Sequence, residues 1–155
     1  MRLKLDKDSF SANERLVAND LGNTLLGSML RLQQHFGLRA EAFQVFFVIV
    51  LATVQKVLRT PDMDAAARSN APLLPEQRGG ISRRRIAEVL GIPLETVRRH
   101  VSQLLQDGMI EERSRGHLST LGGTLASLSQ AGIPYDIAQD FVAVVNAMAK
   151  RGTVR

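Results

Sequence analysis

Residues 81–110 read ISRRRIAEVLGIPLETVRRHVSQLLQDGMI, and this stretch predicts two short helices joined by a tight turn. Ser82 suits the N-cap of the first helix, because its hydroxyl can accept a hydrogen bond from a free backbone N–H. Gly91 supplies the left-handed position that ends this helix. Pro93 suits the start of the second helix, where a missing N–H is tolerated. The two helices are therefore expected to meet at an angle.

The second helix has one apolar and one polar face. With about 100° of rotation per residue, one side carries the aliphatic residues Leu94, Val97, Val101, Leu104 and Leu105. The opposite side carries Glu95, Arg99, Ser102 and Gln106, and Arg98 borders both faces. Such a helix packs through its aliphatic side and presents a polar face whose width suits the major groove of DNA.

A basic hairpin is expected directly after this helix. Gly108 ends the helix, and residues 109–113 alternate enough in polarity for a strand. The turn at residues 114–117 then leads into a second short strand at 118–120. Arginine is favoured against phosphates and in the minor groove. The hairpin is therefore predicted to contact DNA through Arg113, Arg115 and His117.

Basic charge is concentrated around these elements. The chain of 155 residues has 20 Lys and Arg against 15 Asp and Glu, which gives a formal net charge of +5. Residues 78–117 contribute +3 of this charge, and all eight of their basic residues are arginine. Arginine presents a planar fork of donors that matches phosphate oxygens and the edge of guanine. The placement of the charge favours a polyanionic partner more strongly than its size does.

Residues 81–120 resemble the winged helix-turn-helix of bacterial regulators, near the GntR-type domains and the DNA-binding end of the cyclic-AMP receptor protein family. The sequence departs from those families at Pro93, where they often carry serine, and at Leu94, where they often carry a polar or basic residue. Helices on both sides of the motif give the chain a MarR-like layout without matching residues. The resemblance rests on Ser82-Arg83, Ile86-Ala87, Leu90-Gly91-Ile92, Glu95-Thr96-Val97-Arg98, Leu104 and Gly108-Met109-Ile110.

The resemblance implies a sequence-specific DNA-binding transcriptional regulator that acts as a homodimer on a pseudo-palindromic operator. By that resemblance, Glu95 and Arg99 would contact base edges and Thr96 would bind a phosphate. Arg83 would anchor the first helix of the motif. The residues expected at the double-stranded DNA are Ser82, Arg83, Arg84, Glu95, Thr96, Arg98, Arg99, Ser102, Arg113, Arg115 and His117.

Apolar helices are expected on either side of the motif. A first long helix is predicted to start at a capping box of Ser11 and Glu14, a second to run from about 39 to 59, and a last one to start at Pro134. The second helix is apolar on nearly every side, so a second subunit is its simplest cover. Dimer contacts are expected at Leu25, Phe43, Phe46, Phe47, Val50, Phe141 and Val145.

These patterns predict a mainly α-helical fold with a small β-hairpin, in which a winged helix-turn-helix is flanked by N- and C-terminal dimerisation helices. The expected division is an N-terminal helical dimerisation region at 1–60, a linker or loop at 61–80, the DNA-binding domain at 81–120 and a C-terminal helix within 121–155. The linker prediction rests on the Pro, Gly, Asn and Asp residues that cluster there.

Nothing in the sequence favours catalysis, a metal or a cofactor. His35, His100 and His117 lie on separate elements without metal-ligand spacing, and no nucleophile or phosphate-loop motif is present. The chain has no Cys, which excludes thiol chemistry and fits a reducing cytoplasm. The apolar run at 43–54 is shorter than the roughly 20 residues of a membrane span. We therefore expect a cytoplasmic bacterial protein that is not an enzyme and binds no membrane.

Two functional classes stay open at this point. The chain is either a DNA-binding regulator or a winged-helix module for protein–protein interaction, in which Leu94 joins an apolar docking surface and the arginines are merely solvated. Steep salt dependence of DNA binding would favour the first class. A small-molecule effector is a further open partner, for which the Phe43, Phe46 and Phe47 cluster could line a pocket.

Overall fold

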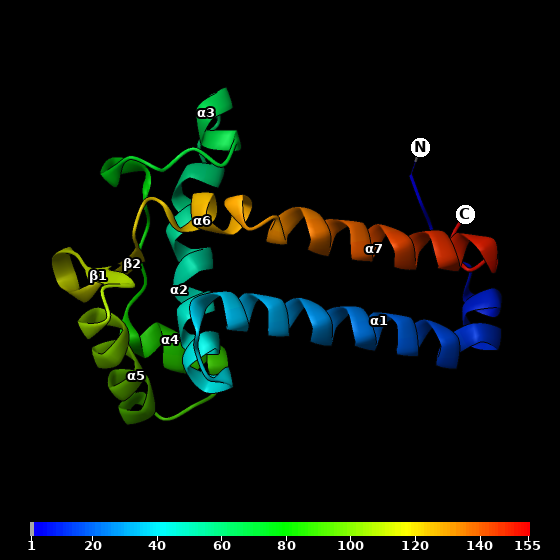
Figure 1. Ribbon diagram of the computed structural model, residues 1–155, viewed down its shortest axis with the longest axis horizontal. Helices are drawn as coiled ribbons and strands as arrows, with labels where there is room; N and C mark the ends of the chain where they lie inside the picture. Colours follow the sequence, from blue (N-terminus) through cyan, green and yellow to red (C-terminus); the bar gives the residue numbers. More distant parts are fainter. Residues whose placement is uncertain (1) are drawn as a thin grey trace. The chain divides into compact units, whose positions relative to one another are not determined.

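The computed structural model describes residues 2–155, which form helices and one two-stranded antiparallel sheet (Figure 1). This is the predicted fold class, a mainly helical chain with a small hairpin. In chain order the elements are α1 (Lys7–Phe36), α2 (Ala40–Leu58), α3 (Ala65–Arg68), the 3-10 turn η1 (Pro75–Gln77), α4 (Arg83–Leu90), α5 (Leu94–Gln106), β1 (Ile110–Glu112), the 3-10 turn η2 (Ser114–Gly116), β2 (Leu118–Thr120), α6 (Thr124–Gln130) and α7 (Ile133–Lys150).

The chain forms two compact units. One contains α1 and α7 with the adjoining segments, up to His35 and from Ser129 onward, and the other spans Phe36–Leu128. The predicted boundaries at residues 60, 80 and 120 do not coincide with these units. Both α2 and the segment 61–80, which contains α3 and η1, belong to the same unit as the two-stranded sheet.

Helix α2 is the central helix of the Phe36–Leu128 unit. It packs against α4, α5 and β2 of its own chain, so much of the cover expected from a second subunit comes from within the chain. Phe43 and Phe46, which were predicted as dimer contacts, are 2% and 1% exposed. Their side chains are therefore not available on the surface. The core of this unit consists of Val45, Phe46, Ile49, Ile86, Val97, Val101, Leu104, Ile110 and Leu118.

The hairpin and the segment before α4 each contact α2 through hydrogen bonds. The register of β1 and β2 pairs Ile110 with Thr120, and the Thr120 N–H donates to Thr53 Oγ1 of α2 at 2.9 Å. The Gly79 N–H donates to the Thr53 carbonyl at 2.8 Å. A Cβ on Gly79 would lie 2.8 Å from the Ala52 carbonyl oxygen, so this position requires glycine. The Thr120 contact thus places β2 against α2, and the Gly79 contacts hold the segment before α4 against the same helix.

By length and composition, α2 is the one helix in the described part of the chain that could cross a membrane, with 19 residues and a mean hydropathy of 1.7. The core helix of a soluble protein meets the same criterion. Val45, Phe46 and Ile49 of this helix are fully or almost fully buried in the core of the Phe36–Leu128 unit, whereas Phe47, Leu51 and Leu58 are exposed.

In the other unit, α1 and α7 lie side by side and run antiparallel (Figure 1). A bridge between Leu5 and Val154 joins the two ends of the chain. Arg151 pairs with Asp20 at 2.8 Å, and a small apolar cluster of Val17, Val144 and Met148 lies between the helices. Few residues of the pair are buried, and much of its apolar surface faces outward.

The predicted start of α1 was wrong by one helical turn. The helix begins at Lys7, where Asp6 Oδ1 accepts a hydrogen bond from the Ser9 N–H at 2.9 Å and so caps the free end. Ser11 lies inside the helix and donates to the Lys7 carbonyl at 3.0 Å. A hydroxyl with this spacing can bond backward within a helix as easily as it can cap one.

Candidate nucleic-acid interface

Helices α4 and α5 have the predicted caps and turn. The Ser82 hydroxyl accepts a hydrogen bond from the Arg85 N–H at 3.2 Å, and Gly91 ends α4 with a φ of 65°. Pro93 stands at the N-cap of α5. These local features end α4 and start α5, so that the chain turns between the two helices.

The apolar stripe of α5 holds the helix against the core, as predicted. Val97 and Val101 are fully buried and Leu104 is 1% exposed. Of the opposite face, Glu95, Arg98, Arg99, Ser102 and Gln106 are exposed, whereas Thr96 is half-buried. The structure thus brings the predicted base-contacting side chains together on one accessible helix face.

The exposed arginines of α4 and α5 are paired with nearby carboxylates at the surface. Arg84 and Arg85 both contact Glu88, at 3.5 and 3.2 Å, and Arg98 pairs with Glu95. Surface pairs of this kind are worth at most about 1 kcal/mol. Their side chains can therefore exchange a carboxylate for a phosphate at small cost.

Of the two arginines on α5, Arg99 has the weaker contact with a carboxylate. It is 73% exposed, and its nearest carboxylate is Glu41 Oε1 of α2 at 3.7 Å. The same carboxylate oxygen lies 2.7 Å from His100 Nε2, which is a much closer contact. Glu41 thus holds His100 against α2 and leaves Arg99 accessible.

Three of the eight arginines in residues 78–117 are instead bound to acceptors inside the Phe36–Leu128 unit. Arg83 donates to both carboxylate oxygens of Glu112 at 2.8 and 3.1 Å. Arg78 donates to Glu111 Oε1 at 3.0 Å and to the Thr120 carbonyl at 3.2 Å. Arg113, which was predicted to contact DNA, donates to the Arg78 and Pro75 carbonyls at 2.8 and 2.7 Å.

Sequence reasoning missed these internal roles, although the acidic pair in β1 was a visible signal. Glu111 and Glu112 are adjacent, so their side chains point to opposite faces of the strand, and each receives a different arginine. The hydrogen bonds from Arg83, reinforced by its charge, lower the pKa of the Glu112 carboxyl below its ordinary value of 4.5, against the opposing effect of burial. The same contact raises the pKa of Arg83.

The tip of the hairpin carries the remaining basic side chains. Arg115 is exposed in the turn η2 with a φ of 61°, which is rare for a residue with a side chain. His117 is exposed at the start of the return toward β2. Among residues 2–155, no charged partner is recorded for Arg115, so its guanidinium projects into solvent as a wing tip would require.

The described residues contain no group of three His, Asp or Glu side chains that could hold a metal ion. His35 lies on α1, His100 on α5 and His117 in the hairpin. His100 is engaged with Glu41.

A comparison with protein families agrees with this geometry. Residues 76–111 match the family described as winged helix-turn-helix DNA-binding. The match covers α4, α5 and the first two residues of β1, so this part of the chain is similar to a winged helix-turn-helix of the DNA-binding class. In that fold the second helix of the motif, here α5, is called the recognition helix, and the β1–β2 hairpin that follows is consistent with the wing. The match assigns the chain to none of the three regulator families that it resembles. No curated protein and no solved structure matches the chain significantly.

Proposed function

We propose that the chain is a sequence-specific transcriptional regulator that binds a pseudo-palindromic operator as a homodimer. The observation that carries this proposal is the exposed polar face of α5, with Glu95 and Arg99 on it, on a helix held in place by Val97, Val101 and Leu104. A helix of this width enters the major groove of B-DNA, which is about 12 Å wide. Arg99 then reaches a guanine edge.

Phosphate contacts come from the arginines around the recognition helix. Arg84 and Arg85 project from the first turn of α4, and Arg115 projects from the wing tip. These side chains fix the position of the domain on the duplex and carry no sequence information themselves. Arg83 and Arg113 act differently: they hold the wing and its supporting loop in the orientation that presents Arg115.

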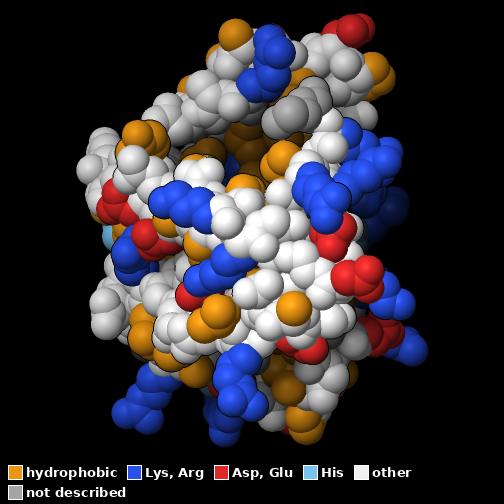
Figure 2. Space-filling model, turned by 90° about the vertical axis from the view of Figure 1, so that its right-hand side faces the viewer, with side chains coloured by type: hydrophobic (Ala, Val, Ile, Leu, Met, Phe, Trp, Pro, Cys, Tyr) orange, Lys and Arg blue, Asp and Glu red, His pale blue; other side chains and the backbone are white. Residues whose placement is uncertain are grey.

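The homodimer is supported by the apolar surface of the α1–α7 unit. Two helices with a buried cluster of three residues bury little apolar surface for their length, and hydrophobic side chains reach the surface among charged ones in Figure 2. Pairing with a second copy would complete a four-helix bundle. The exposed apolar residues of these helices include Leu16, Leu25, Leu26, Met29, Leu30, Phe141, Val142 and Val145.

A two-fold dimer of this kind would present two α5 helices to half-sites about one helical turn, roughly 34 Å, apart on the DNA. The proposal places the protein in the bacterial cytoplasm, where such an operator is accessible. It assigns no catalytic role to the chain, and Arg99 and Glu95 act by recognition alone.

Selection of bound sites from randomised DNA tests the proposal directly. We expect a recovered site with two inverted half-sites about 10 base pairs apart, and an affinity that falls steeply between about 50 and 200 mM salt. Recovery of no sequence, together with salt-independent or absent DNA binding, would overturn the regulator and leave the protein-interaction module. Recovery of a single half-site would overturn the symmetric dimer alone.

A further inference from the structure

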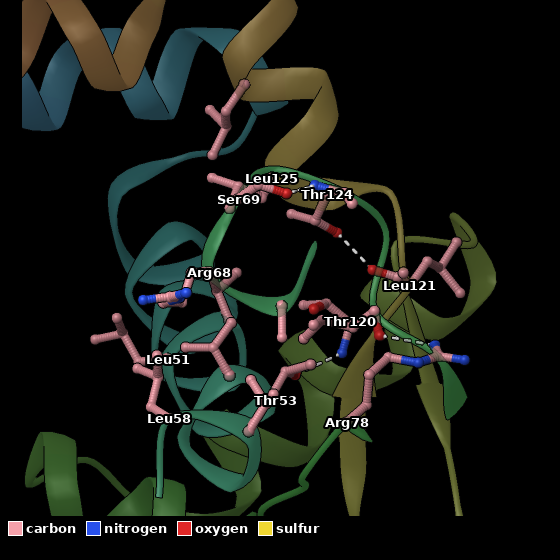
Figure 3. Close-up of a pocket in the computed structure, with 18 of the residues that line it drawn as sticks. Leu51, Thr53, Leu58, Arg68, Ser69, Arg78, Thr120, Leu121, Thr124 and Leu125 are labelled. Atoms are coloured by element: carbon pink, nitrogen blue, oxygen red, sulfur yellow. Dashed lines mark hydrogen bonds between the residues drawn. The ribbon is translucent and has the colours of Figure 1, made fainter. Parts of the chain in front are cut away.

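A cavity of about 410 Å³ lies within the Phe36–Leu128 unit. Its walls come mainly from three parts of the chain, which are α2, the segment 63–73 around α3, and residues 120–128 (Figure 3). The volume falls in the range of about 300 to 1,000 Å³ that small-molecule sites occupy. Of the phenylalanine cluster that the sequence suggested for a ligand pocket, only Phe47 lines this cavity, and none of the residues predicted at the DNA does.

The lining is mostly apolar on all of these walls. Leu51 and Val54 contribute to it from α2, Met63 and Leu73 from the segment 63–73, and Leu125 from α6. Leu51 and Leu125 are 48% and 43% exposed, so apolar surface of the lining is in contact with water. An occupant that covered these side chains would remove that surface from water, which is favourable in proportion to the area covered.

The segment 63–73 forms the outer wall of the cavity, and none of its residues is buried. Its C-terminal end is close to the chain that follows β2, because a Cβ on Gly122 would lie 2.9 Å from the Leu73 carbonyl oxygen. Met63, Ala67 and Leu73 line the cavity and are only half-buried. The outer wall therefore has apolar side chains that an occupant would bury and that the chain itself does not.

The two charged side chains in the lining give no fixed site for a charged group. Arg78 is paired with Glu111 at 3.0 Å and also donates to the Thr120 carbonyl. Its Nε is completely buried and offers no donor to the cavity. Arg68 is exposed to solvent on α3, where water and salt screen its charge. A charged group inside the cavity would lose its hydration without a positioned partner, which is unfavourable.

Most hydroxyl groups of the lining already donate to backbone carbonyls, each within its own helix or turn. The Thr120 hydroxyl is the exception, because no partner is recorded for it among residues 2–155. A hydroxyl can donate or accept, so it can bind one polar group of either kind and selects no charge. The donors already engaged are Thr53 to Ile49 at 2.8 Å, Ser69 to Ala66 at 2.7 Å and Thr124 to Leu121 at 3.1 Å.

We propose that this cavity binds a neutral, largely apolar small molecule between the aliphatic side chains of α2 and those of the segment 63–73. The molecule carries at most one polar group, for which the Thr120 hydroxyl is the free partner. The site lies outside the proposed DNA interface, so it stands or falls separately from the proposed regulatory function.

The neutral dye N-phenyl-1-naphthylamine and its sulfonate, 8-anilino-1-naphthalenesulfonate, test the proposal on the full chain. They share one skeleton and differ by a negative charge. We expect saturable binding of the neutral dye, measured by its fluorescence, at least about tenfold tighter than binding of the sulfonate, because the cavity compensates no charge. Equal or tighter binding of the sulfonate, or no saturable binding of the neutral dye, would overturn the proposal.

Variants on two facing walls locate the site. Val54→Phe on α2 and Ala67→Leu on α3 each add volume to the cavity, so each should weaken binding of the neutral dye about tenfold or more. Val89→Phe is the matched control, because Val89 is 51% exposed on α4 and does not line the cavity, and it should leave the affinity unchanged. Unchanged affinity in both cavity variants places the dye elsewhere and contradicts the assignment.

Methyl resonances give a readout in the wild-type protein that does not depend on how well any variant folds. Signals of Met63 and Leu125, which lie on different walls, should both shift when the neutral dye is added at constant protein concentration. If they shift with protein concentration and not with the dye, a second copy of the chain covers the cavity and the proposal is wrong. If neither signal responds to the dye, the proposal is equally wrong.

Discussion

Arg83 and Glu112 join the first residue of α4 to the last residue of β1 through two parallel hydrogen bonds, from Nη1 at 2.8 Å and from Nη2 at 3.1 Å. The two residues are 29 positions apart in the chain. A guanidinium engaged at both ends of its fork holds a fixed orientation. This pair therefore ties the wing to the helix-turn-helix, and it removes Arg83 from the set of freely available cations.

The stabilising effect of this pair should depend on pH. Because the pKa of Glu112 is lowered in the folded chain from its ordinary value of 4.5, the contribution is complete above that value and is lost as the pH falls through the folded pKa. Both side chains are partly exposed, which limits the contribution to about 1 kcal/mol or less. Urea unfolding of wild type and Glu112→Gln should show a difference near pH 6 that becomes smaller at a pH well below 4.5. An equal difference at both pH values contradicts the prediction.

Release of Arg83 should strengthen DNA binding. Glu112→Gln removes a negative charge and frees a guanidinium at the start of α4, so binding to random DNA should tighten. The plot of log affinity against log salt should steepen by about 0.9 for the added phosphate contact. Glu76→Gln, which removes the same charge from an exposed position, is the control. If both variants give the same slope, Arg83 does not reach the DNA.

Arg99 and Arg115 should affect DNA binding in different ways. Arg99 lies on the exposed face of α5, so Arg99→Ala should cost about 1 to 3 kcal/mol on the selected operator and relax sequence preference. Arg115 lies at the wing tip, so Arg115→Ala should weaken binding to all sequences alike. Competition between operator and random DNA measures both effects. Equal losses on the two DNAs for Arg99→Ala would remove its assigned role.

Gly79 should tolerate no side chain. A Cβ there would lie 2.8 Å from the Ala52 carbonyl oxygen and 3.3 Å from Lys56 Cβ, both on α2. Gly79→Ala should therefore lower the free energy of unfolding by about 1 to 3 kcal/mol, as overpacking does. Gly22→Ala is the matched control: no atom lies within 4 Å of its added Cβ inside α1, so it should raise stability by about 0.5 to 1 kcal/mol. Denaturant unfolding compares the two.

The oligomeric state tests the role of the α1–α7 unit. Light scattering should give wild-type protein twice the 17.0 kDa of the chain, because the exposed leucines of α1 need a cover. Leu26→Glu and Val142→Glu each add a charge to an exposed apolar position of this unit and should give monomers. Leu74→Glu changes an equally exposed leucine outside it and should stay dimeric. A monomeric wild type would remove the dimer from the proposal.

Much of the DNA-binding motif could be predicted from residues that act over one or two helical turns. The Ser82 cap, the Gly91 turn and the buried stripe of Val97, Val101 and Leu104 all follow from local rules of capping and periodicity. The same rules misplaced the start of α1, because Ser11 bonds backward to Lys7. A local sequence pattern predicts structure reliably only where it is compatible with a single local conformation, and a serine such as Ser11 can either cap a helix or lie inside one.

The sequence by itself determined the elements and the polarity of their faces, whereas the tertiary structure decided which faces meet. The apolar pattern of α2 required a cover but did not specify it, and the fold supplied α4, α5 and β2 of the same chain. The arginine-rich sequence at 78–117 likewise did not show that Arg115 is exposed whereas Arg113 is bound. The acceptors of Arg113 lie 35 and 38 positions away in the chain. Periodicity is a property of one segment, while a hydrogen bond or a core contact also depends on where the rest of the chain lies.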